Sequence, residues 1–142
     1  MKKITDYRSW NTDLASLLLR LVFGGLFVFY HGYGKIANYQ MILPQFKDML
    51  GIGPQLSFNL VIFAEFFCAI LVLVGFLTRL AVIPIFITMF VAYFVAHAGA
   101  EFMVRELSFL FMFLSIITAI LGSGKYSVDR LVFKSKPDAH LL

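Results

Sequence analysis

Three ionisable side chains interrupt long apolar runs of this sequence and are the first candidates for chemistry. They are Arg20, His31 and Glu65. An ionisable group inside a long apolar helix is energetically costly, so a functional role with a nearby partner is the first hypothesis. An isolated carboxylate at Glu65 would take up a proton rather than stay charged. The three residues therefore predict a charge pair or proton relay, with Glu65 and Arg20 as its members.

Helical spacing places two of these residues on one stripe of the first apolar run. At about 100° per residue, Arg20, Gly24, His31 and Lys35 fall within an arc of roughly 60°. The stripe should face other helices, and the pair Gly24-Gly25 would let one of them approach closely.

Arg20 is the expected counter-ion of Glu65. With a rise of about 1.5 Å per residue, the two backbones differ in depth by about 10 Å, much of which a long arginine can cover. His31 is the alternative partner. A pair that only stabilises the bundle is the competing interpretation, although buried ion pairs often add little net stability.

A second candidate face lies on the third apolar run. Phe86, Phe90, Tyr93 and His97 are spaced by four, three and four residues, so they share one side of a helix. Aromatic residues at this spacing are more often ordinary core, but the histidine falls at the depth of His31. We therefore expect an aromatic-walled cavity with a polar cluster at one end. The further ionisable residues expected at this level are Lys35, Glu101, Arg105 and Glu106.

Other kinds of chemistry find no support in the sequence. No metal site is predicted, because the histidines lack a His-x-x-His or Glu-x-x-His spacing with Glu65 or Glu106. Cys68 is the single cysteine, which excludes an intrachain disulfide and a dithiol motif. No serine or cysteine has a recognisable base partner. The net charge of +4 does not indicate nucleic-acid binding, because the basic residues lie near the ends of apolar runs.

The elements that position these residues are predicted membrane-spanning helices. The chain has 142 residues, of which 61% are apolar and 14% charged, whereas a soluble domain is about 45–50% apolar and about 25% charged. So small a fold cannot hide this excess in a core, so a lipid bilayer is the expected surrounding. The predicted fold is one all-α domain over residues 1–142, an integral membrane four-helix bundle. Its spans are predicted at about residues 14–33, 58–77, 80–96 and 104–121.

The connections between the spans differ in character. The first is the longest, and Pro44–Gly51 within it is predicted as a short interfacial helix, with proline first and glycine past its end. Thr78-Arg79 forms a tight hairpin between the second and third spans, and a basic tail follows Gly122. The charged N-terminus resembles the start of a signal peptide. The apolar run that follows is too long for one, so it is expected to be a retained span.

The distribution of basic residues predicts the orientation. Eight fall on the side of the N-terminus, the hairpin and the tail, and three on the opposite side. Cytoplasmic segments carry the excess of lysine and arginine, so both termini are expected in the cytoplasm. The polar cluster around His31 and His97 is then expected near the outer face. The eight are Lys2, Lys3, Arg8, Arg79, Lys125, Arg130, Lys134 and Lys136, and the three are Lys35, Lys47 and Arg105.

A series of short stretches, from about residue 14 to 132, resembles the DoxX family of small bacterial membrane proteins. The resemblance implies a four-helix domain in the bacterial inner membrane. It also implies an association with quinone-linked oxidoreductase complexes, including small subunits of thiosulfate:quinone oxidoreductase, or with membrane complexes that handle oxidative stress. The matching stretches are Arg20-Leu-Val-Phe-Gly24, His31-Gly32 with Lys35, Ala64-Glu65, Gly75 with Thr78-Arg79, His97, and Gly122-x-Gly124-Lys-Tyr-Ser-Val-Asp129.

The leading hypothesis is a quinone-binding subunit of an inner-membrane redox complex. A quinone headgroup needs a flat apolar slot, hydrogen-bond donors and a proton route. The aromatic stripe would supply the slot, the two histidines the donors, and Glu65 with Arg20 the proton route. A partner redox subunit, or a second copy of the chain, is expected beside it. The predicted ligand-binding residues are His31, Lys35, Tyr93, His97, Phe86, Phe90 and Glu106.

Two other functions stay open from the sequence. In a scaffold or assembly subunit, the same polar groups would only set the helix register. A small-molecule transporter or receptor is less favoured, because the sequence lacks a pair of spans broken by glycine or proline.

Overall fold

The computed structural model describes residues 6–133. Four helices are long and apolar enough to cross a membrane, and no strand occurs in this range. The predicted all-α membrane bundle is therefore confirmed, with each span beginning two to four residues earlier than predicted. The spans are Thr12–Ala37, Pro54–Val74, Thr78–Ala96 and Phe102–Leu121.

Three of the spans contain a short π-helical segment. The first consists of α1 (Thr12–Gly25), π-helical Leu26–Gly32 and α2 (Tyr33–Ala37). The second consists of α4 (Pro54–Ile62), π-helical Phe63–Cys68 and α5 (Ala69–Val74). The third consists of α6 (Thr78–Val91) and π-helical Ala92–Ala96, whereas the fourth is one α-helix, α7 (Phe102–Leu121). Such segments occur frequently at functional sites.

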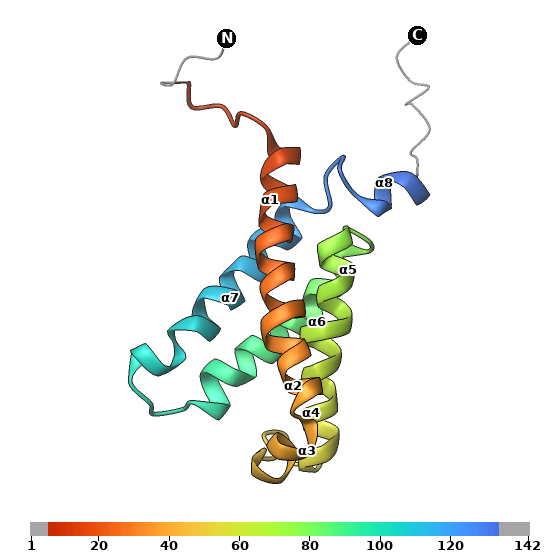
Figure 1. The fold of residues 1–142 in the computed structure, drawn as a ribbon. Helices are drawn as coiled ribbons and strands as arrows, with labels where there is room; N and C mark the ends of the chain where they lie inside the picture. Colours follow the sequence, from red (N-terminus) through yellow and green to blue (C-terminus); the bar gives the residue numbers. More distant parts are fainter. Residues whose placement is uncertain (1–5, 134–142) are drawn as a thin grey trace.

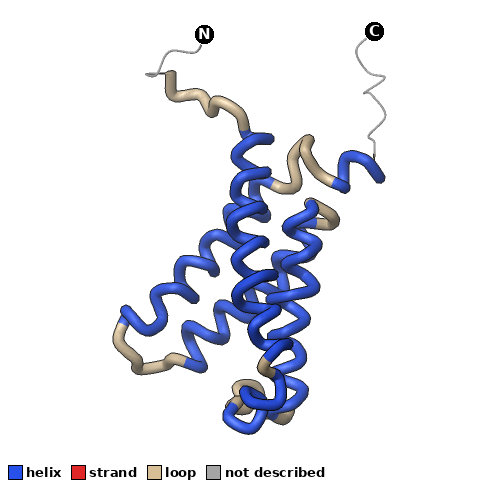
Figure 2. The backbone as a smooth tube through the Cα atoms, in the orientation of Figure 1, coloured by secondary structure: helices blue, strands red, loops and turns tan. Residues whose placement is uncertain are grey.

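The spans pack as two pairs. α6 and α7 form one pair, and α1 lies beside α5 in the other (Figures 1 and 2). Apolar side chains fill the space between them, with Phe23, Phe27 and Ile85 fully buried. Many others point outward, such as Phe29, which is 72% exposed. An apolar exterior of this kind suits a lipid surrounding rather than water.

The predicted interfacial helix Pro44–Gly51 is wrong in position. The helical residues come earlier, in α3 (Tyr39–Ile42) and a 3₁₀ turn at Leu43–Gln45, and residues 46–53 form a loop. The carboxylate of Asp48 accepts hydrogen bonds from the backbone N–H groups of Leu50, Ile52 and Gly53. A side chain that takes these donors offers the backbone an alternative to the helix.

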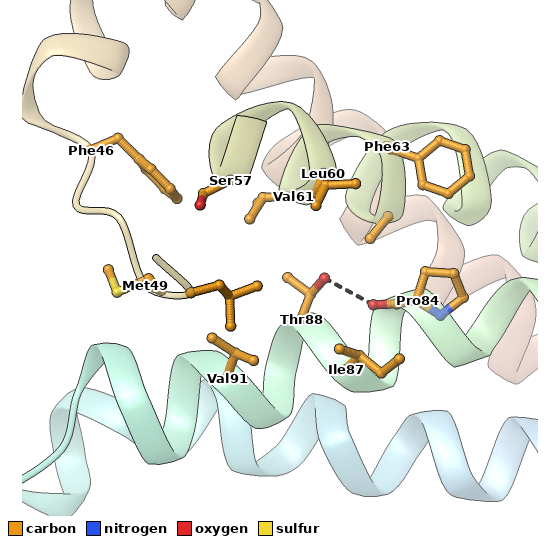
Figure 3. A pocket seen from close by; sticks show the side chains of 12 residues that line it. Phe46, Met49, Ser57, Leu60, Val61, Phe63, Pro84, Ile87, Thr88 and Val91 are labelled. Carbon is orange, nitrogen blue, oxygen red and sulfur yellow. Dashed lines mark hydrogen bonds between the residues drawn. The ribbon is translucent and has the colours of Figure 1, made fainter. Parts of the chain in front are cut away.

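This segment, the 46–53 loop, packs against the second and third spans. The Phe46 ring lies 4.8 Å from that of Phe58. The side chains of Phe46 and Met49 lie at one end of the space between α4 and α6 (Figure 3). The loop therefore covers the end of the bundle at which Lys35 lies.

Residues after the fourth span, which we call the C-terminal segment (residues 122–133), fold back over the opposite end of the bundle. It includes α8 (Val128–Val132), which Ser127 caps by accepting from the N–H of Arg130. The N–H of Asp129 donates to the carbonyl oxygen of Gly75 (2.9 Å), and its carboxylate accepts from the N–H of Leu77 (2.8 Å). The start of α1 and α8 therefore lie at the same end of the molecule (Figure 1).

The predicted orientation in the membrane stays a prediction. Four of the basic residues counted for it lie outside the described residues, namely Lys2, Lys3, Lys134 and Lys136.

Candidate functional site

Four of the predicted site residues line one cavity of about 500 Å³, which we call the polar cavity. His31 and Lys35 reach it from the first span, Glu65 from the second and His97 from the end of the third. All three π-helical segments contribute to its wall, through His31, Glu65 and Ala96 among others. The apolar part of the wall comes from Phe27, Met89 and Phe111, and Gln45–Met49 closes one end.

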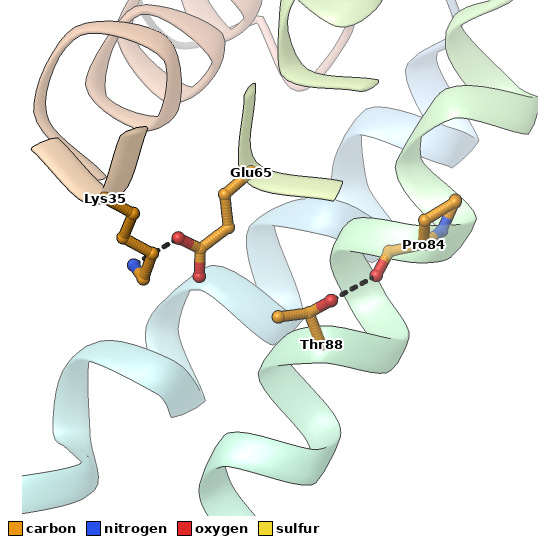
Figure 4. Close-up of polar contacts among 4 residues, drawn as sticks. All are labelled: Lys35, Glu65, Pro84 and Thr88. Atoms are coloured by element: carbon orange, nitrogen blue, oxygen red, sulfur yellow. Dashed lines mark hydrogen bonds and ion pairs between the residues drawn. The ribbon is translucent and has the colours of Figure 1, made fainter. Parts of the chain in front are cut away.

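Lys35 and Glu65 form an ion pair between the first and second spans (Figure 4). The side chain of Glu65 is 5% exposed and that of Lys35 is 24% exposed. Gly32 allows this approach, because a Cβ atom there would lie 2.6 Å from the carbonyl oxygen of Glu65. The pair thus links the Glu65 carboxylate of the second span to the ammonium group of Lys35, the last residue of the stripe on the first span.

The predicted Arg20–Glu65 pair is wrong. Arg20 extends toward the other end of the bundle, where Nη1 donates to the carbonyl oxygen of Leu73 (3.1 Å) and Nη2 to that of Tyr126 (2.6 Å). Leu73 lies in the last turn of α5, where carbonyl groups lack a partner within the helix. These free acceptors explain why the guanidinium lies there instead of beside Glu65. Arg20 is 1% exposed and does not line the polar cavity.

The close approach expected at Gly24-Gly25 occurs at the first glycine. A Cβ atom at Gly24 would lie 3.0 Å from the backbone nitrogen of Leu73, whereas one at Gly25 would meet nothing within 4 Å.

Each cavity histidine is held differently. Nδ1 of His97 lies 2.8 Å from the carbonyl oxygen of Ala92. Since a carbonyl only accepts, Nδ1 carries the hydrogen, and Nε2 of the neutral ring is an acceptor. The His31 ring packs edge-to-face on Phe111 at 5.6 Å and lies 5.3 Å from Phe27. Its nitrogens have no hydrogen-bond partner among residues 6–133 and are free for a ligand.

The other predicted ligand-binding residues do not line the polar cavity. Phe86 and Phe90 pack on one another with ring centres 6.2 Å apart, and Phe90 is 44% exposed. Tyr93 lies against Arg105, whose guanidinium carbon is 4.6 Å from the ring centre, and Glu106 is exposed. The prediction assumed an α-helical phase up to residue 97. The π-helical segment Ala92–Ala96 changes that phase, so His97 no longer shares a face with the aromatic residues.

Several residues of the cavity wall were not among the predicted site residues. Phe27 lies only about 20° outside the arc of Arg20, His31 and Lys35, so the stripe itself could have identified it. Phe111, Met89 and Ser108 carry no such signal, because ordinary core positions have the same residue types and spacing. Within residues 6–133, no group of three or more histidine, cysteine, aspartate or glutamate side chains is placed to hold a metal ion.

Comparisons with known proteins place the chain among bacterial membrane proteins. The DoxX family model matches residues 15–98, a range that contains His31, Lys35, Glu65 and His97. A Bacillus subtilis (strain 168) protein named "Putative oxidoreductase CatD" is 28% identical over 130 residues, 91% of this chain and 95% of that protein. The Escherichia coli (strain K12) protein named "Inner membrane protein YqjF" is 34% identical over 127 residues, 86% of this chain and 95% of that protein. No solved structure matches.

Proposed function

The chain belongs to the DoxX family of membrane proteins, and we propose that its polar cavity binds the headgroup of a quinone in an inner-membrane redox complex. The observation that carries this proposal is the convergence of His31, Lys35, Glu65 and His97 on one cavity. The name of the Bacillus subtilis relative is in keeping with a redox role.

The size and chemistry of the cavity suit a quinone ring. Its volume of about 500 Å³ lies within the range of about 300–1,000 Å³ that is usual for small-molecule sites. Phe27 and Phe111 supply aromatic walls, with their ring centres 4.7 Å apart. This pair takes the part first predicted for Phe86, Phe90 and Tyr93.

The polar groups divide between donors and an acceptor. The Lys35 ammonium group has three N–H donors, of which one is used by Glu65, and His31 has an unpartnered ring. Both can donate to a quinone carbonyl oxygen. Nε2 of neutral His97 can instead accept from the hydroxyl group of a quinol. The cavity can thus bind both redox forms.

Reduction of a quinone to a quinol consumes two electrons and two protons. The Lys35–Glu65 pair at the cavity wall can pass both protons from water to the two quinone oxygens, one after the other, and so takes the part of the predicted Glu65–Arg20 proton route. We propose that a partner redox subunit supplies the electrons. The orientation predicted from the basic residues would put this chemistry near the outer face of the membrane.

A scaffold role is the second candidate, and Arg20 favours it. Both hydrogen bonds of its guanidinium go to backbone carbonyl oxygens, so this side chain holds segments of the fold together. If the protein is only a scaffold, substitutions of the cavity residues should not change ligand binding.

Quinone binding to the purified protein tests the proposal. His31→Ala and His97→Ala are expected to weaken binding of a short-chain ubiquinone analogue by about tenfold each, equivalent to about 1.4 kcal/mol. Glu106→Gln, a predicted residue that lies outside the cavity, is the control and should bind as the original protein does. Unchanged affinity in both histidine variants would refute the site.

A further inference from the structure

A second cavity of about 310 Å³, which we call the apolar groove, lies between α4 and α6 (Figure 3). Side chains from the two helices point toward one another across it, and the 46–53 loop closes one end. Leu60, Phe63 and Ile87 on its rim are 45%, 47% and 53% exposed, so the groove opens sideways to the surrounding lipid.

The side chains that line the groove offer no free hydrogen-bond donor. Only two of its lining residues have a polar side chain, Ser57 and Thr88. The Ser57 hydroxyl donates to the Asp48 carboxylate (3.1 Å), and the Thr88 hydroxyl donates to the carbonyl oxygen of Pro84 (2.8 Å). A hydrocarbon therefore loses nothing by lying there, whereas the oxygen atoms of a polar ligand would find no donor.

The groove adjoins the polar cavity, because five residues line both. Val61 comes from the second span, one helical turn before Glu65, and Thr88 comes from the third span. The full set of shared residues is Phe46, Met49, Val61, Thr88 and Val91. The two spaces together fit a molecule with a polar head and an apolar chain.

We propose that the apolar groove holds the isoprenoid tail of the quinone and forms its lateral passage from the bilayer to the polar cavity. This inference rests on the proposed function. The lining from Ser57 to Ala64 extends about 10 Å along the second span, enough for the first part of such a tail.

The expected effect is steric rather than hydrophobic. The bilayer is as apolar as the groove, so moving a tail between them gains little free energy. A blocked groove would instead leave the tail without a path when the headgroup occupies the cavity. Blocking should therefore weaken long-tailed quinones and spare a ring without a tail.

The experiment compares two substitutions on one helix. Ile87→Trp narrows the groove, and Ile83→Trp places the same bulk one turn away, outside it, at a residue of similar exposure (50% against 53%). Each protein in nanodiscs is titrated with a long-chain ubiquinone and with the same ring lacking its tail.

The proposal expects Ile87→Trp to weaken binding of the long-chain quinone by about tenfold. Binding of the tailless ring should not change, and Ile83→Trp should change neither. If Ile87→Trp leaves long-chain binding intact, or weakens both probes equally, the tail does not lie in the groove, although the headgroup site stands. If neither probe binds the original protein, the proposed function fails and this inference with it.

Discussion

Arg20 in the first span donates a hydrogen bond of 2.6 Å to the carbonyl oxygen of Tyr126, 106 residues further along the chain. Its second bond, to Leu73, reaches the end of α5. The first span makes two more contacts with the C-terminal segment, since Ser16 donates to the carbonyl oxygen of Gly122 and Asp13 accepts from the N–H of Lys125. One buried guanidinium therefore joins the first span, the second span and the C-terminal segment.

Arg20→Met should destabilise the protein without changing the polar cavity. The substitution leaves two partly buried carbonyl oxygens without this donor, which costs about 1–3 kcal/mol in the free energy of unfolding. Thermal unfolding in detergent measures the loss. The control is Arg130→Met, because Arg130 is exposed and only its backbone N–H is hydrogen-bonded. Quinone affinity per folded Arg20→Met molecule should be unchanged. A loss of affinity would show that Arg20 contributes to quinone binding after all.

The Lys35–Glu65 pair should show strong coupling in a double-mutant cycle. Lys35→Met leaves the buried Glu65 carboxylate uncompensated and should lower the free energy of unfolding by about 3 kcal/mol. Adding Glu65→Gln removes that charge, so the double variant should be more stable than Lys35→Met alone. Unfolding midpoints of the four proteins measure the coupling. Additive effects would show that the two side chains do not interact in the membrane.

The Asp48 carboxylate should make the 46–53 loop sensitive to acid. Hydrogen bonds from the backbone, of which that from Gly53 contributes most, lower the pKa of Asp48 below its usual value. A lowered pKa in the folded state means that the stabilisation is full above the ordinary aspartate value, about 4, and disappears as the pH falls through the lowered one. Hydrogen-exchange protection of the loop should therefore be constant near neutral pH and decrease below about pH 4.

Asp48→Asn is the matched test of this acid effect. The variant should lose loop protection already at neutral pH and show no further decrease on acidification. Asp6→Asn should behave as the original protein does, because Asp6 accepts from the nearby N–H of Arg8 and not from the loop. If the loop of the Asp48 variant exchanges as slowly as the original, Asp48 does not hold it.

The spans and the meeting of His31 with His97 were predictable because they depend on composition and on the depth that the rise per residue gives along each helix. The partner of Arg20 was not, because its acceptors are backbone carbonyl groups, which leave no mark in the sequence. The loop was mistaken for a helix because Pro44 and Gly51 suit helix ends, while the competing bonds of Asp48 depend on a turn formed further on. The prediction that His97 shares a face with the aromatic residues failed because the π-helical segment Ala92–Ala96 shifts the helical phase. No residue type in the sequence indicates such a segment.

Gly32 should prove to be the residue that sets the distance between the first and second spans at the cavity. A Cβ atom there would lie 2.6 Å from the carbonyl oxygen of Glu65 and 2.7 Å from the Cβ of Phe66, so Gly32→Ala must push the two helices apart. Overpacking of this kind costs about 1–3 kcal/mol.

Gly25→Ala is the matched control for Gly32→Ala, since an added Cβ at Gly25 meets nothing within 4 Å. In a helix interior, alanine is favoured over glycine by about 0.5–1 kcal/mol, so this variant should be neutral or slightly more stable. Gly32→Ala should lower both the unfolding midpoint and the quinone affinity, because moving the helices apart also separates Lys35 from Glu65. Equal stability of the two variants would mean that the first and second spans do not approach closely at Gly32.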